Sequence, residues 1–262
     1  MDAIIEIGPL GLMFAYGFLI LILFLTSKQG IGKEKEIVIS TIRMTLQLIL
    51  MGYLLVYIFD QSSVIITLLI FTVMVTFAIR NIFSRVKKPI NKKLRRVVIL
   101  SMISGTVITT FYFLLLVISL DPWYEPRYFI PIAGMVIGNS MTGIALGTER
   151  LLGEMKSRAQ LVEGALMLGA TPRDATMGIT RDVFTSAIMP TINSMVGMGI
   201  IFLPGMMTGQ ILAGISPLVA IEYQIAIMLG ILGAVSITLF MLTRLGYQTF
   251  FNKWSQLEDM EE

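Results

Sequence analysis

Long apolar stretches separated by short polar ones dominate the hydropathy pattern of this chain. Several of these stretches reach the roughly 20 residues that an α-helix needs to cross the hydrocarbon core of a bilayer. The pattern therefore predicts an all-α, polytopic integral membrane protein with a single transmembrane domain over residues 1–262. We expect about seven spans, at residues 9–26, 37–59, 64–83, 97–120, 129–147, 183–204 and 217–242.

Lysine and arginine residues alternate between the predicted connections and so predict the topology. They occur after the first, third and fifth spans and in the C-terminal tail, whereas the second and sixth connections carry none and the fourth carries only Arg127. Because cytoplasmic loops are enriched in Lys and Arg, the N-terminus is expected outside and the C-terminus in the cytoplasm. The polar interval 148–182 is then cytoplasmic. Residues 1–8 contain no Lys or Arg, so we expect the first apolar run to be a retained span rather than a signal peptide.

The composition limits the chemistry that this chain can perform. Hydrophobic residues make up 55% of the sequence and charged residues 14%, and there is no cysteine and no histidine. These absences exclude Ser/His/Asp and Cys/His nucleophiles and the zinc-protease motif, and the sequence has no Gly-x-x-x-x-Gly-Lys-Ser/Thr phosphate loop. We therefore expect no enzyme activity, no cofactor bound by this chain, and ATP hydrolysis, if used, on a partner. The net charge of +3 comes largely from residues beside the spans, which indicates membrane lipid rather than nucleic acid as a partner.

Polar side chains inside the spans are the first candidates for a transport path, because they are costly to bury in a bilayer. Gln47 lies in the second predicted span, Asn139 in the fifth and Glu222 near the outer end of the seventh. For Gln47 and Asn139, a hydrogen bond between helices is an equal alternative. Glu222 also fits an interfacial position, so the metal-binding residues, if any, stay open at this stage.

Some of the 19 methionines are further candidates, although most suit the role of adaptable apolar filler. Met195 and Met198 share one face of the sixth predicted span. Met206, Met207 and Gln210 follow in a glycine-rich break, and irregular backbone at membrane depth is tolerated where it is buried in protein or lines a cavity. Because thioethers suit soft cations such as Cu(I) and oxygen donors suit harder ones, these residues predict a cation path.

The segment from Glu163 to Asp174 combines a helix stop with a helix start between two apolar runs. Gly169 can end one helix in the left-handed conformation. Thr171 can cap the next helix, with Pro172 at its first position and Asp174 three residues after the cap. The segment predicts a rigid helix–turn–helix on the cytoplasmic face, where it can be presented to a partner.

The pattern Glu163-Gly164-Ala165-x-x-x-Gly169-Ala170 resembles the EAA loop of ATP-binding-cassette permeases, which docks into a groove of the partner ATPase. Gly164 departs from the importer consensus, which has alanine there. Together with Gly138-Asn139, Glu149-Arg150-Leu151 and the run from Leu203 to Gly214, this pattern resembles the FetB-type permeases. That family is described as bacterial iron exporters and includes a plant relative linked to aluminium tolerance.

The resemblance implies the cell-membrane subunit of a two-component transporter that exports iron or a related metal cation. Two permease copies would pair with two copies of a separate ATPase, which binds the ATP. The residues expected at the ATPase contact are Glu163, Gly164, Ala165, Gly169, Ala170 and Pro172. Two alternatives stay open: a permease for another solute such as a nucleotide sugar, and a regulatory membrane protein that recruits an ATPase without conducting anything.

Overall fold

The computed structural model describes residues 7–60, 62–86 and 88–258. Within these ranges the chain is helical, and its β-structure is limited to two isolated bridges, Met198–Phe202 and Phe251–Leu257. Six helical stretches there are long and apolar enough to cross a membrane, which confirms the all-α membrane class. They are Pro9–Lys28, Glu34–Asp60, Val64–Arg85, Lys92–Val117, Pro126–Ser157 and Pro217–Phe250.

The first of two compact units contains the three N-terminal helices and residues 212–214. The helices are α1 (Pro9–Ala15), α2 (Gly17–Lys28) and α3 (Glu34–Asp60). Gly30 and Gly32, both with positive φ, form the turn between α2 and α3. Among the described residues of this unit, Ile58 is the one that is buried. Such exposed apolar helices are stable only where lipid or other protein covers them.

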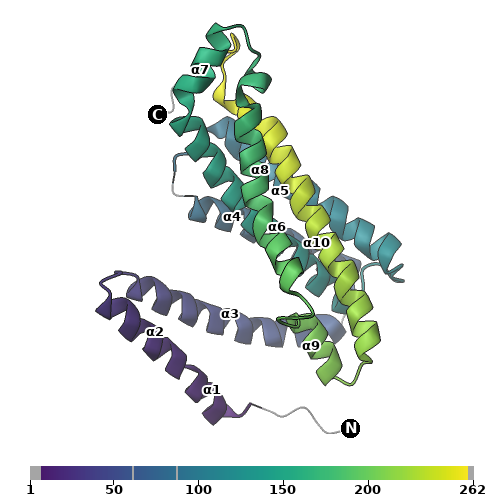
Figure 1. Ribbon diagram of the computed structural model, residues 1–262. Helices are drawn as coiled ribbons and strands as arrows, with labels where there is room; N and C mark the ends of the chain where they lie inside the picture. The colour runs from purple at the N-terminus through teal and green to yellow at the C-terminus, as the bar shows by residue number, and fades with distance from the viewer. Residues whose placement is uncertain (1–6, 61, 87, 259–262) are drawn as a thin grey trace. The chain divides into compact units, whose positions relative to one another are not determined.

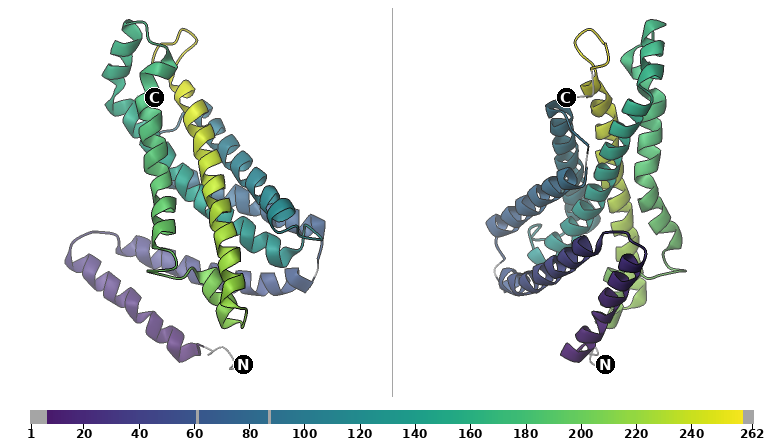
Figure 2. Two further views of the ribbon diagram at one scale, coloured as in Figure 1. Left: turned by 45° about the vertical axis from the view of Figure 1, so that its right-hand side comes forward. Right: turned by 90° about the vertical axis from the view of Figure 1, so that its left-hand side faces the viewer.

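The second unit contains residues 63–211 and 215–262 and is described up to residue 258. Its helices are α4 (Val64–Arg85), α5 (Lys92–Tyr112), the π-helical turn η1 (Phe113–Val117), α6 (Pro126–Ser157), α7 (Ala159–Met167), α8 (Pro172–Gly197), α9 (Gly205–Leu212), α10 (Pro217–Gly246) and the 3₁₀ turn η2 (Tyr247–Phe250). Figures 1 and 2 show α8 and α10 side by side and antiparallel, so that the start of α8 lies beside the end of α10.

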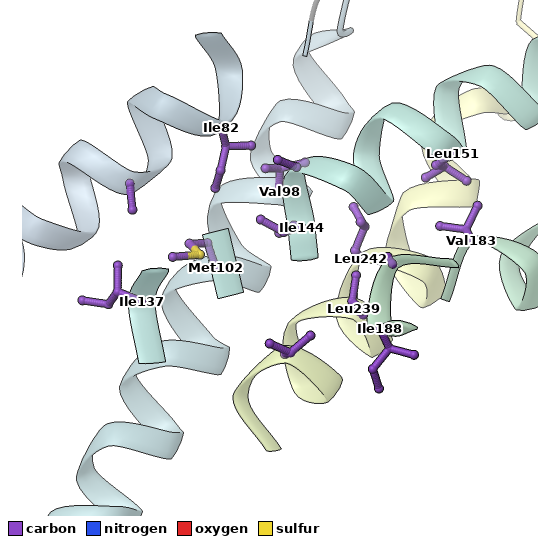
Figure 3. Packing of buried hydrophobic residues seen from close by; sticks show 14 of the residues in the cluster. Ile82, Val98, Met102, Ile137, Ile144, Leu151, Val183, Ile188, Leu239 and Leu242 are labelled. Atoms are coloured by element: carbon purple, nitrogen blue, oxygen red, sulfur yellow. The ribbon is translucent and has the colours of Figure 1, made fainter. Parts of the chain in front are cut away.

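The core of this unit forms where α10 packs against α5, α6 and α8, and where α4 packs against α6. Figure 3 shows apolar side chains from all five of these helices meeting in this core. Small residues bring the backbones of α5 and α10 close together: a Cβ built on Gly105 would lie only 2.1 Å from Thr238 Oγ1. At one end, aromatic rings close the core, with Phe129 5.5 Å from Phe71 and 6.4 Å from Trp123 between ring centroids.

Two predicted span boundaries are wrong. The fourth span, predicted to reach Leu120, ends as a helix at Val117, and Ser119 after it has φ of +54°. The sixth, predicted as residues 183–204, belongs to a helix that begins at Pro172 and ends at Gly197. It ends there because Gly199 adopts φ of +83° and its N–H donates to the Phe202 carbonyl at 2.9 Å.

α8, which corresponds to the sixth predicted span, is not among the six long apolar stretches, although the five predicted spans before it and the one after it are. The reason is its polar content, since Arg181, Asp182 and Asn193 interrupt its apolar residues. Although Pro190 lies inside it, this helix continues without interruption from the polar interval into the predicted sixth span.

Candidate functional site

The turn between α7 and α8 has the geometry that the sequence predicts. Gly169 has φ of +91°, its N–H donates to the Leu166 carbonyl at 3.0 Å, and the Ala170 N–H donates to the Ala165 carbonyl at 3.0 Å. This pair of bonds is the Schellman motif, which satisfies carbonyls at the end of a helix. The α8 N-cap follows at once, as Thr171 Oγ1 accepts from the Asp174 N–H at 3.2 Å.

Ion pairs and one buried side chain hold the α7–α8 turn against the rest of the unit. Arg158 lies between two carboxylates, with Nε 2.9 Å from Glu154 Oε2 and Nη1 3.0 Å from Asp182 Oδ2 on α8. Glu154 also pairs with Arg150 at 3.2 Å. Val162 on α7 is only 2% exposed. These contacts hold the beginning of α7 and the middle of α8 in place on either side of the turn.

The tip of the turn exposes large apolar side chains. Met167 is 85% exposed and Leu168 is 91% exposed, and Leu161 on α7 is also exposed. A rigid segment that displays apolar side chains beside charged ones is typical of a protein interaction site. Of the residues expected at a partner contact, Glu163 and Gly169 are exposed, and the others are half-buried, namely Gly164, Ala165, Ala170 and Pro172.

A cavity of about 430 Å³ lies between the end of α8 and the first turns of α10. Four methionines line it: Met195, Met198, Met207 and Met228. Gln224 is the polar side chain of the lining; it is 7% exposed, and its amide nitrogen donates to the Met198 sulfur at 3.6 Å. We call these residues the methionine cavity.

Irregular backbone forms part of the wall of the methionine cavity. Met198, Gly199 and Leu203, in the stretch between α8 and α9, are all lining residues. The sequence places the glycine-rich break at Met206–Gln210, and that location is wrong. The break covers residues 198–204, and the segment from Met206 to Gln210 is helical, in α9.

The other predicted pathway residues of the second unit are not among the lining residues of this cavity. Met206 packs at the edge of the apolar core, and Gln210 Oε1 is buried without a hydrogen-bond partner among the described residues. Asn139 Nδ2 donates to the Met135 carbonyl of its own helix at 2.8 Å, so this described bond is not the bond between helices expected as the alternative to a path. Glu222 is exposed and lines a different, apolar cavity, and Gln47 lies exposed on α3 in the first unit.

Sequence reasoning missed two possible cation ligands in the lining of the methionine cavity, Gln224 and Met228. Both lie on α10, one turn apart, and α10 is apolar around most of its circumference, so that no stripe marks the face that meets α8. The available signal was Gln224 itself, a lone amide inside an apolar span.

The donors of the methionine cavity are neutral thioethers and one amide. Among the residues that the structure describes, no group of three or more His, Cys, Asp or Glu side chains could hold a metal ion. Without a charged ligand, this cavity suits weak binding of a cation in transit rather than tight retention.

Residues 9–251 match the uncharacterised protein family UPF0014. The probable iron export permease protein FetB of Escherichia coli is 35% identical over 246 residues, which cover 94% of this chain and 93% of the relative. The protein ALUMINUM SENSITIVE 3 of Arabidopsis thaliana is 37% identical over 91% of this chain and 86% of its own. A UPF0014 membrane protein of Synechocystis is 34% identical over 97% of this chain and 98% of its own. No solved structure matches the chain.

Proposed function

This chain belongs to the UPF0014 family of membrane proteins, and on that premise we propose that it is the permease subunit of an ATP-binding-cassette transporter that exports iron or a related metal cation. The observation that carries the proposal is the α7–α8 turn, a braced helix–turn–helix with exposed Met167 and Leu168 at its tip. A chain without a phosphate loop needs a surface of this kind to contact an ATPase, so that ATP hydrolysis there can drive a conformational change here. Two copies of the permease would pair with two copies of that ATPase.

α8 is the element that connects the docking surface to the transport path in this proposal. It has 26 residues, which is about 39 Å at 1.5 Å per residue, and so exceeds the roughly 30 Å of a hydrocarbon core. We assign it as the sixth of seven spans, with the α7–α8 turn in the cytoplasm. Its first turn follows the docking surface directly, and its last turn carries Met195 at the methionine cavity. ATP-driven movement of the turn would shift the helix and change the shape of the cavity.

The methionine cavity is assigned as a station on the cation path. Four thioethers and the buried Gln224 amide can replace part of the water around a cation without binding it tightly. Export requires release, so weak neutral ligands suit this direction of transport. The relative named as a probable iron export permease supports iron as the cargo.

Reconstitution of the permease with its ATPase in liposomes tests the function. We expect Fe²⁺ to stimulate ATP hydrolysis and to move across the membrane with ATP, whereas nucleotide sugars do neither. Stimulation by a nucleotide sugar and not by metal ions would establish the permease alternative with a different solute. A complex that hydrolyses ATP without moving any of these solutes would support the regulatory alternative instead.

The cavity assignment has its own test within the same assay. Met198→Leu keeps the side-chain volume but removes the sulfur, so we expect lower cation transport with an unchanged melting temperature. Met189→Leu is the matched control, because Met189 is an exposed residue of α8 that does not line the cavity. Equal transport in the two variants would remove the methionine cavity from the path.

A further inference from the structure

A second cavity lies at the other end of the α8–α10 pair. It has a volume of about 250 Å³ and is formed by the first turns of α8, the last turns of α10 and the start of η2. Its lining includes Arg173 and Arg244, and none of its lining residues is acidic. The rise of 1.5 Å per residue places Met195 about 33 Å along α8 from Arg173, so the two cavities are separated by about one hydrocarbon thickness.

The two arginines of this cavity have no acidic partner within the described part of the chain. Among the described residues, neither Arg173 nor Arg244 takes part in an ion pair. The guanidinium of Arg244 lies 5.9 Å from the centroid of the Phe240 ring, at the outer limit of a cation–π contact. The pair therefore presents two positive charges to one hollow without internal neutralisation.

Helix stability accounts for one of these arginines but not for the other. Arg244 lies in the last turn of α10, where a cation is favoured by the negative end of the helix dipole. Arg173 lies in the first turn of α8, at the positive end of its dipole, where a cation is disfavoured. An anion bound between the two side chains would offset the unfavourable interaction of the Arg173 charge with the helix dipole.

The remaining walls of the cavity match an amphipathic ligand. The Thr180 and Tyr247 side chains contribute hydroxyl groups, while Met177 is 65% exposed and Phe240 is 56% exposed. Arg244 lies two residues beyond the predicted end of the last span, a position that the predicted topology puts at the depth of lipid headgroups on the cytoplasmic side. Arginine pairs bind phosphate oxygens through two parallel N–H donors each, which lysine does not match.

We propose that Arg173 and Arg244 form a binding site for the phosphate group of a phosphorylated ligand at the cytoplasmic end of α8 and α10, supplied either by an anionic phospholipid headgroup or by soluble phosphate. The site would fix the start of α8 to the end of α10. The proposal does not depend on which cargo is transported, because the site lies at the opposite end of the helix pair from the methionine cavity.

The test uses the full-length chain in nanodiscs of phosphatidylcholine, with phosphatidylglycerol or inorganic phosphate added in separate arms. The variant is Arg173→Gln with Arg244→Gln. The control is Arg181→Gln, which removes an exposed arginine of α8 that does not line the cavity. We expect phosphatidylglycerol to be retained on the wild type and the control in native mass spectrometry, and its affinity for the double variant to fall about tenfold.

The separate additions of phosphatidylglycerol and inorganic phosphate distinguish the source of the phosphate group, and their results can refute the proposed site. A rise in melting temperature with phosphatidylglycerol alone identifies the lipid headgroup, and a rise with inorganic phosphate as well identifies soluble phosphate. Equal binding by the double variant and the control, or no binding by the wild type in either arm, would refute the site. If the double variant does not fold, Arg173→Lys with Arg244→Lys replaces it, and we expect this variant to keep the charge but to bind more weakly.

Discussion

At the scale of single residues, the α7–α8 turn depends on Gly169. A φ of +91° is accessible to glycine but strained for residues with a Cβ. The sequence was sufficient to predict this turn, because a glycine stop and a Thr-Pro start are local signals that need no tertiary context. The exposure of Met167 and Leu168 beside it was not predictable, since it depends on how α7 packs.

Gly169→Ala should weaken both the fold of the turn and the coupling of the transporter. The left-handed conformation costs an alanine about 1 kcal/mol, so we expect a lower melting temperature and reduced cation-stimulated ATP hydrolysis in the reconstituted complex. Gly178→Ala is the control, because Gly178 lies within α8 and an added Cβ meets no atom within 4 Å there. Unchanged stimulation in Gly169→Ala and in the bulkier Gly169→Leu would contradict a coupling role for the turn.

Replacing Gln224 can distinguish a role in packing from a role in transport, because the two roles predict opposite changes in protein stability. Its described hydrogen bond is to a weak acceptor, the Met198 sulfur, so Gln224→Leu removes a poorly satisfied buried amide. We expect the variant to be at least as stable as the wild type but to transport less cation, measured by thermal unfolding and by uptake into liposomes. A less stable variant with normal transport would show that the amide is structural.

At the scale of helices, the sequence located most of the elements but misjudged those around the methionine cavity. Hydropathy located six spans, because length and apolar content are properties of each segment alone. Hydropathy did not reveal that residues 198–204 form irregular backbone while residues 205–212 form helix α9. The apolar and glycine residues of both segments are compatible with either conformation. The pairing of α8 with α10, and with it the contribution of Met228 to the cavity, comes from tertiary packing.

The contact of α5 with α10 should be sensitive to a single methyl group. A Cβ at position 105 would lie 2.1 Å from Thr238 Oγ1 and 3.2 Å from the Ala234 carbonyl oxygen. Gly105→Ala should therefore destabilise the protein by about 1–3 kcal/mol, measured by reversible unfolding in detergent. Adding Thr238→Ala should restore part of this loss, and Gly233→Ala, where a Cβ meets nothing within 4 Å, should be tolerated. A stable Gly105→Ala protein would contradict this packing.

At the scale of the whole molecule, the topology is the prediction that follows from charge rather than from packing. The family match extends over residues 9–251 and so includes helices of both compact units. Sequence alone identified the membrane class and the geometry of the α7–α8 turn. It did not select one metal as the proposed cargo, because neutral thioether and amide ligands do not discriminate strongly among metals.

Introduced cysteines can test whether α8 crosses the membrane, since the chain has no cysteine of its own. In intact cells, a membrane-impermeant thiol reagent should label Ser216→Cys but not Ser157→Cys, as both positions are exposed and lie on either side of α8. Labelling of both should follow permeabilisation. If the two positions react from the same side, α8 does not cross the membrane and its assignment as a span must be abandoned.

The placement of two cavities on one pair of antiparallel helices has a thermodynamic consequence. If a phosphate bound between Arg173 and Arg244 changes the affinity of the methionine cavity for a cation, then the cation must change the affinity for phosphate by the same factor. The reciprocity concerns equilibrium binding and holds whatever route the linkage takes through α8 and α10. A cell could then adjust export through the composition of its inner leaflet, and a filled cation path would in turn recruit anionic lipid.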